Sequence, residues 1–259
     1  MGILNVTPDS FSDGGVFFAP EAALEHARDM VAAGAAIIDV GGESTRPGAA
    51  PVALQEELRR VIPVIEALSA TLPVPVSIDT RNPAVMQAAV AAGAGMINDV
   101  NALQAPGALK MAASLGVPVC LMHMQGLPES MQENPEYADV VTEVRQFLAD
   151  RANACLAAGM ARARILLDPG FGFGKTSRHN LLLLQQLDRL VAEGYPVLVG
   201  LSRKSLIGKV LGLPVDERLY PGLALAVLAV WQGAAIVRTH DVRATREAVD
   251  MCHAVSRAV

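Results

Sequence analysis

Short apolar runs rich in Ile, Val and Leu recur along the chain, and each is followed by a longer Ala-rich amphipathic stretch. Such short runs are typical of buried parallel strands, and the longer stretches are typical of the helices that cover them. The pattern predicts strands at 2–6, 36–40, 74–78, 95–97, 118–122, 164–167, 196–200 and 235–237. It predicts helices at 22–33, 54–70, 83–92, 106–115, 138–158, 179–192, 223–232 and 243–257. This alternation favours an α/β protein with a (β/α)8 TIM barrel, formed as a single domain over residues 1–259, rather than an open doubly wound sheet.

Polar side chains stand at the ends of the predicted strands. They are Asn5, Asp39, Glu43, Asp79, Asn98, Asp99, His123, Asp168, Ser202, Lys204, Arg238 and His240. The turns that lead into the strands carry mostly alanine and glycine instead. Because the active sites of (β/α)8 barrels lie at the carboxyl ends of the strands, this asymmetry predicts an enzyme with its site at that end.

The composition excludes several other classes of protein. The chain of 259 residues is 52% hydrophobic and 18% charged, which excludes a disordered chain and a coiled coil. Its longest apolar stretch, 223–231, is too short to cross a bilayer. A net charge of −5, with 4% aromatic residues and no basic run, predicts neither a nucleic-acid nor a membrane partner. Three cysteines without metal-ligand spacing, and no targeting pattern after Met1, predict a cytoplasmic protein.

Two tempting motifs have less specific interpretations. The run Gly-Phe-Gly-Phe-Gly-Lys-Thr at 170–176 looks like a phosphate loop, but Pro169 stands where the Walker pattern needs glycine. Phe173 in this run is interpreted as a wall for a flat ligand, with core packing as the alternative. His123 lies on an apolar strand, which is more typical of a hydrogen-bonded core histidine than of a metal ligand. The remaining helical histidines, His26, His179 and His253, are expected to be solvated.

Six segments carry a resemblance to a known family. They read NVTPDSFSDGG (5–15), GGESTRPGA (41–49), LMHMQG (121–126), LLDPGFGFGK (166–175), GLSRKSLIG (200–208) and RTHDV (238–242). In this order and at these strand ends they are similar to the dihydropteroate synthases, and the resemblance spans almost the entire chain. It implies a transferase of folate biosynthesis that condenses 6-hydroxymethyl-7,8-dihydropterin pyrophosphate with 4-aminobenzoate, giving 7,8-dihydropteroate and pyrophosphate. Sulfonamides imitate the aminobenzoate in that family.

The resemblance implies a pterin pocket formed by Asp79, Asn98, Asp168 and Lys204. The residue types suit this ligand, because a carboxylate such as Asp168 can accept two hydrogen bonds from the guanidine-like edge of a pterin. The alternative is that Asp168 only caps the following loop. Asn98 can add amide contacts, and Lys204 supplies a cation for the pterin carbonyl. Asp99 points to the other side of its strand and is expected to anchor the structure.

The resemblance also implies a pyrophosphate clamp of Asn5, Thr45, Arg238 and His240, with Asn5 holding a Mg²⁺ ion that bridges the phosphate oxygens. Arg238 and His240 are two residues apart on the last strand, so their side chains face the same side. A surface ion pair between Arg238 and Asp241 is the alternative. The residues expected to be catalytic are Asp79, Lys204, Arg238 and His240.

The expected aminobenzoate pocket consists of Phe11, Thr45, Arg46, Pro47, Phe173 and Ser202, while Arg203 is expected to point away. Two other functions remain open, a pterin-binding methyltransferase of the same superfamily and a silent pterin-binding paralogue. Against the first, Arg238, His240 and Lys204 have no role in methyl transfer. Finally, the segment 223–231 is apolar on more sides than packing on the barrel needs. Together with the resemblance to a dimeric family, this predicts a homodimer through the helices around the last strand.

Overall fold

The computed structural model describes residues 1–6, 20–43, 52–126 and 131–258. Within these ranges the chain forms a closed ring of parallel strands. The strands are β1 (Gly2–Asn5), β2 (Ile38–Gly41), β3 (Val76–Asp79), β4 (Met96–Asp99), β5 (Val119–Met122), β6 (Ile165–Asp168), β7 (Leu198–Gly200) and β8 (Ile236–Arg238). The first six pair in sequence order, and β7 pairs with β8. Parallel bridges from Leu167 to Val197 and from Gly2 to Thr239 close the ring.

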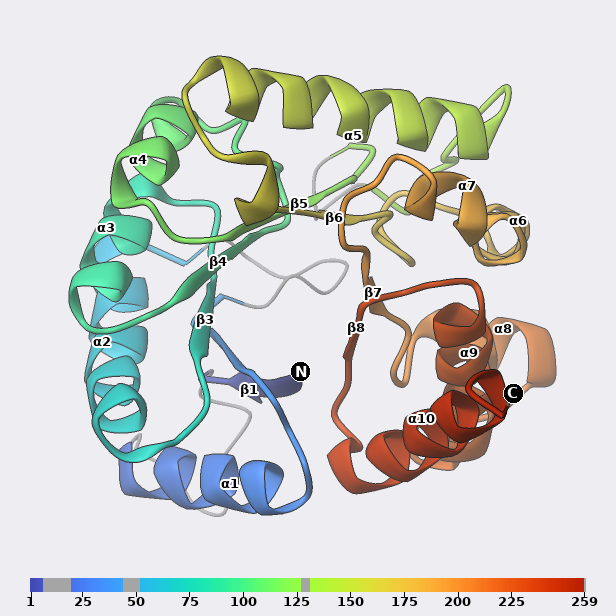
Figure 1. Cartoon of the computed structure of the whole chain (residues 1–259), viewed down its shortest axis with the longest axis horizontal. Coiled ribbons are helices and arrows are strands. Elements are labelled where there is room, and N and C mark those ends of the chain that lie inside the picture. Colours follow the sequence, from blue (N-terminus) through green and yellow to red (C-terminus); the bar gives the residue numbers. More distant parts are fainter. Residues whose placement is uncertain (7–19, 44–51, 127–130, 259) are drawn as a thin grey trace.

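Helices surround the strands on the outside (Figure 1). They are α1 (Pro20–Ala32), α2 (Leu54–Thr71), α3 (Pro83–Ala91), α4 (Ala108–Leu115), α5 (Val140–Ala157), α6 (Ser177–Gln185), α7 (Leu187–Val191), α8 (Ser205–Leu211), α9 (Leu219–Trp231) and α10 (Val242–Ser256). Short 3-10 turns, η2 (Arg162–Arg164) and η3 (Val215–Glu217), precede β6 and α9. The predicted (β/α)8 barrel is therefore confirmed. None of the helices in the described ranges is both long and apolar enough to cross a membrane.

Several helices differ from the prediction. The predicted helix 179–192 is divided into α6 and α7, because Gln186 leaves helical geometry at φ −119° and ψ 29°. The segment after β7, where no helix is predicted, forms α8, which ends at Gly212 in the left-handed region. The helix predicted from Pro106 begins at Ala108 instead. Its preceding residue, Gly107, adopts φ +84°, so the helix cannot extend back to the proline.

Side-chain caps determine where several helices begin. Asn82 accepts the Ala84 N–H ahead of α3, with Pro83 in the first helical turn. Thr176 and His179 form a capping box at the start of α6, each accepting a backbone N–H of the other. His179 is thus partly buried and structural, so its predicted solvated state is wrong.

The strands divide the interior into two regions. Residues facing outward join the helices in the main hydrophobic core. Residues facing inward form a smaller apolar cluster inside the barrel, made of Met96, Cys120, Leu166 and Leu198. Two residues further along, the inward positions of β4, β6 and β8 are Asn98, Asp168 and Arg238. The barrel interior is therefore apolar in its middle and polar at the carboxyl ends of its strands.

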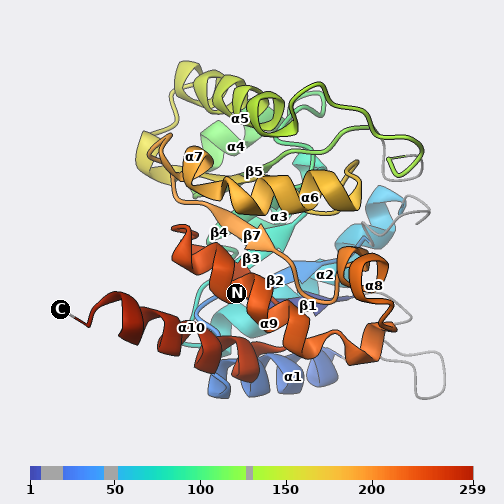
Figure 2. The ribbon, with the colours of Figure 1, turned by 90° about the vertical axis from the view of Figure 1, so that its right-hand side faces the viewer.

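Helices α9 and α10 lie side by side on one flank of the barrel (Figure 2). They leave large apolar side chains in solvent, since Leu228 and Trp231 of α9 are 52% and 62% exposed. On α10, Met251 and Val255 are 67% and 55% exposed. The predicted apolar surplus of this part of the chain is thus present on its surface.

Candidate active site

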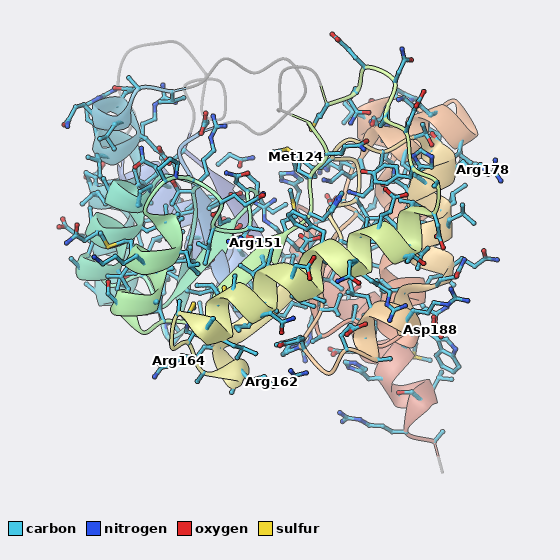
Figure 3. The ribbon with its side chains drawn as sticks, turned by 90° about the horizontal axis from the view of Figure 1, so that it is seen from above. Met124, Arg151, Arg162, Arg164, Arg178 and Asp188 are labelled. Carbon is cyan, nitrogen blue, oxygen red and sulfur yellow. The ribbon has the colours of Figure 1, made fainter. Side chains whose placement is uncertain are left out.

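The polar strand ends meet at one end of the barrel. Figure 3 shows the polarity: Met124, which follows β5, lies toward one end, and Arg162 and Arg164, which precede β6, lie at the other. Parallel strands bring their carboxyl ends to the same edge of the sheet, so Asp79 and Asn98 are direct cross-strand neighbours. Asp168 pairs with Met122 in the same way. The structure thus brings the predicted strand-end residues of β1, β3, β4, β6 and β8 to the same end.

An arginine held by two carboxylates lies at the centre of this end. Arg238 donates from Nε to Asp39 Oδ2 at 2.6 Å and from Nη2 to Asp79 Oδ2 at 2.8 Å. Asn98 donates from Nδ2 to the same Asp39 oxygen at 3.1 Å. Asp39 is fully buried, and its Oδ1 has no hydrogen-bond partner in the described part of the chain. The alternative ion pair between Arg238 and Asp241 is therefore wrong.

Burial makes this group sensitive to protonation. It raises the pKa of Asp79 to about 7; Arg238 opposes this rise, and the carboxylate of Asp39 adds to it. Burial acts on Arg238 in the opposite direction, but the two carboxylates dominate and raise its pKa above the ordinary value. The arginine therefore stays charged, while Asp79 can take up a proton near neutral pH.

Asp168 is a buried carboxylate with one oxygen committed to the protein. Its Oδ1 accepts the Gly170 N–H at 2.7 Å, so the predicted alternative of a loop cap is part of its role. Its Oδ2 has no hydrogen-bond partner among the described residues, which leaves an acceptor for a ligand. Burial raises the pKa of Asp168, and the Gly170 hydrogen bond and the Lys204 ammonium oppose that rise.

Lys204 reaches toward the same carboxylate from the residue before α8. Its Nζ donates to the Phe171 carbonyl oxygen at 2.7 Å and lies 4.2 Å from the centre of the Phe173 ring. Burial lowers the pKa of Lys204 to about 8, and Asp168 counteracts part of this shift. Phe173 is thus in contact with a predicted site residue rather than packed only into the core.

Ser202 and His240 lie together beside these groups. The Ser202 hydroxyl accepts the His240 N–H at 3.2 Å and donates to Asp241 Oδ2 at 3.4 Å. Arg203 turns outward, with 49% of its side chain exposed, and forms an ion pair with Asp241. The prediction that Arg203 points away from the site agrees with this contact.

Two neighbouring predictions concern anchors rather than ligands. Asp99 accepts the backbone N–H groups of Asn101 and Leu103, both at 2.7 Å, so its predicted anchoring role is confirmed. His123 is buried against Lys175, with 2.9 Å between His123 Nδ1 and Lys175 Nζ, as predicted for a hydrogen-bonded core histidine. The inward direction of Lys175 is not predicted, because no pattern in the sequence distinguishes it from a surface lysine.

Four predicted aminobenzoate residues, Phe11, Thr45, Arg46 and Pro47, lie outside the described residues. Glu43 joins the two residues that flank the segment 44–51, because its side chain binds the backbone of Val52. This carboxylate accepts from Arg81 Nη2 at 3.0 Å and from the Val52 N–H at 3.4 Å. The pairing of Glu43 with Arg81 was not predicted. Glu43 follows β2 and Arg81 follows β3, so the pairing of these two neighbouring strands is the signal that could have suggested it.

No group of three or more His, Cys, Asp or Glu side chains that could hold a metal occurs in the described ranges. The predicted metal ligand, Asn5, ends β1, and its amide makes no hydrogen bond to another described residue. A single amide oxygen suits a hard cation that takes most of its ligands from phosphate and water. The residues present therefore fit a magnesium ion that binds together with a phosphorylated substrate.

Comparison with known proteins identifies the chain as a pterin-binding enzyme, which agrees with this fold and site. The model of the pterin binding enzyme family matches residues 1–240. The dihydropteroate synthase of Escherichia coli K12 is 53% identical over 258 residues, covering 100% of this chain and 92% of its own. That of Haemophilus influenzae is 51% identical, covering 100% of this chain and 94% of its own. The chain belongs to the dihydropteroate synthase family, and it is a transferase.

Solved structures agree in fold. The Yersinia pestis dihydropteroate synthase in a sulfonamide drug complex superposes with a TM-score of 0.95 at 52% identity, covering 99% of this chain and 94% of its own. A Xanthomonas albilineans dihydropteroate synthase with 4-aminobenzoic acid superposes with a TM-score of 0.94 at 52% identity, covering 100% of this chain and 93% of its own. A further structure from the same organism contains 7,8-dihydropteroate, with a TM-score of 0.91 at 49% identity and coverage of 100% and 93%.

The charge balance around Arg238 gives a testable pH dependence. In Arg238→Met, Asp39 and Asp79 lose their cation, so the free energy of unfolding at about pH 8 should fall by about 3 kcal/mol. A carboxyl whose pKa is raised by folding binds its proton more tightly in the folded state, so the lost stability returns as pH falls toward the unfolded value of about 4. Urea unfolding at about pH 5.5 should show the deficit reduced by at least ~1 kcal/mol.

Arg246→Met is the matched control, because Arg246 pairs with Asp250 on the surface, where both side chains are more than half exposed. It should cost no more than about 0.5 kcal/mol at either pH. A deficit in Arg238→Met that is equal at both pH values would contradict the assigned role of the two carboxylates.

Proposed function

We propose that the carboxyl end of the barrel carries out the dihydropteroate synthase reaction with the residues described above. In this reaction 6-hydroxymethyl-7,8-dihydropterin pyrophosphate and 4-aminobenzoate give 7,8-dihydropteroate and pyrophosphate. The observation that carries the assignment is the buried Asp168, whose Oδ2 is open to a ligand. Burial raises the pKa of Asp168, and the nearby Lys204 ammonium counteracts part of this rise, so the two side chains form a pair of opposite charge. A flat ring with adjacent N–H donors on one edge and a carbonyl on another suits this pair.

For the pterin, Asp168 accepts hydrogen bonds from the guanidine-like edge and Lys204 donates to the ring carbonyl. Asn98 and Asp79 contact the remaining ring nitrogens. Support comes from the cross-strand pairing of Asp79 with Asn98 and from the burial of both residues. Buried groups that leave acceptors open lose less on binding a ligand than solvated groups do, because their desolvation is already complete.

For the aminobenzoate, Phe173 and Ser202 provide one side of the pocket, and Phe11, Thr45, Arg46 and Pro47 provide the other. Phe173 is supported as a wall because its ring lies against the Lys204 ammonium, next to the proposed pterin position. Ser202 is supported by its contacts to His240 and Asp241, which orient its hydroxyl toward the last strand.

For the leaving group, Arg238 and His240 bind the pyrophosphate with Asn5 and Thr45, and Asn5 is a ligand of Mg²⁺. When bound at Asn5, a Mg²⁺ ion would supply positive charge beside the pyrophosphate. Arg238 already spends two of its donor groups on Asp39 and Asp79. Its Nη1 makes no hydrogen bond within the described ranges, so its two N–H donors remain for phosphate oxygens.

The bond between the pterin methylene carbon and the pyrophosphate oxygen breaks with its electron pair, which leaves with the pyrophosphate. The amine lone pair of 4-aminobenzoate then forms the new C–N bond, and the amine proton passes to water. Because an aryl amine is a weak nucleophile, positioning and charge stabilisation lower the barrier more than a general base does. The roles of Asp79, Lys204, Arg238 and His240 in catalysis are therefore electrostatic.

We also propose that residues 1–259 form one catalytic domain in the cytoplasm. The match of the pterin-binding family over residues 1–240 and the closure of the barrel between Gly2 and Thr239 support one domain. Three cysteines, all buried and unpaired, suit a reducing compartment.

The pterin assignment is tested with Asp168→Asn. An amide places a donor against the donors of the ring, so the affinity for 6-hydroxymethyl-7,8-dihydropterin should fall by at least ~2 kcal/mol, roughly thirtyfold. Isothermal calorimetry measures the affinity. A pyrophosphate-release assay with both substrates should show the reaction in the wild type and its loss in the variant.

Asp188→Asn is the control, because Asp188 is exposed on α7 and should leave affinity and turnover unchanged. Pterin affinity within about twofold of the wild type in Asp168→Asn would remove Asp168 from the pocket. Absence of pyrophosphate release in the wild type with both substrates would instead favour a silent pterin-binding protein.

The leaving-group assignment is tested with His240→Asn, since Arg238 also supports the barrel. Binding of the pyrophosphorylated dihydropterin should weaken by about 1.5 kcal/mol, and binding of the bare hydroxymethyl pterin should change by less than about 0.3 kcal/mol. Omitting Mg²⁺ should enlarge the difference, because the cation and the side chain meet the same negative charge. Equal losses for both ligands would place His240 on the ring or in the scaffold.

We further propose that the protein forms a homodimer through α9 and α10. Trp231 and Met251, on adjacent helices, are both more than half exposed, and such a patch is unusual on a monomer. In a twofold symmetric dimer, this patch contacts the same patch of the second subunit, so both are buried and no other surface of the protein is needed.

Sedimentation at about 20 μM should give twice the chain mass of 27.1 kDa. A double substitution, Trp231→Glu with Met251→Glu, should give a folded monomer, because two charges cannot be buried in the apolar contact. Leu181→Glu, at a 44% exposed position on α6, should leave the dimer intact. A wild-type monomer at this concentration would refute the proposal.

A further inference from the structure

The Gly-Phe-Gly-Phe-Gly-Lys run after β6 places a lysine inside its own loop. Lys175 is 2% exposed, and its Nζ lies 3.0 Å from the carbonyl oxygens of both Gly170 and Phe173. The same atom lies 2.9 Å from His123 Nδ1 and 3.3 Å from the His123 carbonyl oxygen, at the end of β5. Its ammonium therefore has four acceptors for three N–H donors. A phosphate loop binds an anion through backbone N–H groups. This loop instead binds the Lys175 ammonium through backbone carbonyl oxygens.

The loop also presses against the chain after β5. A Cβ built on Gly170, at φ +67°, would lie 1.9 Å from the His123 carbonyl oxygen. One on Gly174, at φ +61°, would lie 2.3 Å from the Gln125 carbonyl oxygen. Only glycine therefore allows this close approach, and the Lys175 ammonium joins the two segments by donating to the carbonyl oxygens of His123 and Gly170.

The charges that face Lys175 come from three elements. Burial lowers the pKa of Lys175 to about 7; Asp168 on β6 opposes this shift, and Lys204 before α8 adds to it. His123 on the β5 side is neutral, because burial and then Lys175 lower its pKa to about 3. The imidazole therefore accepts from the ammonium through an unprotonated Nδ1.

The outer surface of this loop holds Lys204. The carbonyl oxygen of Phe171 accepts from Lys204 Nζ at 2.7 Å, and the Phe173 ring lies 4.2 Å from the same atom. Phe171 lies one residue after Gly170, and Phe173 is itself a carbonyl partner of Lys175. The inner lysine thus fixes the backbone whose outer side positions the other lysine.

We propose that Lys175 is a positioning residue for the transferase reaction, which fixes the loop 169–175 so that Phe171 and Phe173 hold Lys204 at the pterin. The inference rests on the proposed contact of Lys204 with the pterin. Lys175 itself touches no substrate. It acts only through the backbone of its own loop.

The test is a double-mutant cycle on pterin affinity with Lys175→Met and Lys204→Met. Calorimetry with 6-hydroxymethyl-7,8-dihydropterin should show a loss of roughly tenfold for each single variant. The double variant should lose little more than Lys204→Met alone, because both changes remove the same contact. Lys110→Met, on the surface helix α4, is the matched control and should bind as the wild type does.

The pH dependence of pterin affinity is a second test, because a general loss of stability does not change its midpoint. In the wild type, pterin affinity should fall as pH rises through the pKa values of Lys175 and Lys204, about 7 and about 8. In Lys175→Met, the step from Lys175 is absent and Lys204 leaves its buried position, so the midpoint of the fall should move upward toward the ordinary lysine value. An unchanged midpoint would overturn the proposal.

If Lys175→Met does not fold, His123→Leu removes one acceptor of the ammonium and should weaken pterin binding about threefold, again without adding to the loss in Lys204→Met. Multiplicative losses in either cycle would overturn the positioning role and leave Lys175 as a structural residue. If Lys204→Met alone binds pterin as the wild type does, the proposed role of Lys204 fails instead, and the two failures are distinct.

Discussion

The Arg238 guanidinium between two buried carboxylates is the interaction on which the rest of the site depends. It joins β8 to β2 and β3 across the barrel, at 2.6 Å and 2.8 Å. Asn98 from β4 adds a further contact to the same carboxylate. Four strands are therefore connected by a single polar cluster above the apolar interior. The carboxylates need the cation because both are buried, and the cation needs them for the same reason. Neither charge can be changed without altering the geometry of the strand ends.

A second cluster around Asp168, Lys175 and Lys204 repeats this arrangement with the charges reversed. Two ammonium groups share the field of one buried carboxylate, and backbone carbonyls provide the remaining acceptors. Burial lowers the pKa of both lysines and raises that of the carboxylate. The two clusters together give the end of the barrel opposite charges at fixed positions, as a substrate with a polar ring and an anionic leaving group requires.

The fold and the strand-end residues could be predicted from the sequence because both follow local rules. Their positions at the ends of predicted strands brought Asp79, Asn98 and Asp168 to one end of the barrel, and strand alternation separated Asp99 from Asn98. The two partners of Arg238 were not predicted, because Asp39 and Asp79 are 199 and 159 residues away and no local pattern joins them to it. The inward turn of Lys175 depends on the conformation of three glycines, which the sequence alone does not define. The short α8 was missed because seven residues carry too little periodicity.

The closure of the barrel has a consequence for how the chain folds. The bridge between Gly2 and Thr239 joins opposite ends of the sequence, whereas every pairing within the sheet from β1 to β6 joins strands that follow one another in the chain. Contacts between sequence neighbours form early, and the most distant contact carries the largest loop-closure entropy. A sheet of β1 to β6 that forms during synthesis has two open edges until β7 and β8 have been made. Unpaired edges of this kind associate readily with other chains. The time that the ribosome takes to complete the last quarter of the chain is thus the period in which aggregation competes with the native barrel.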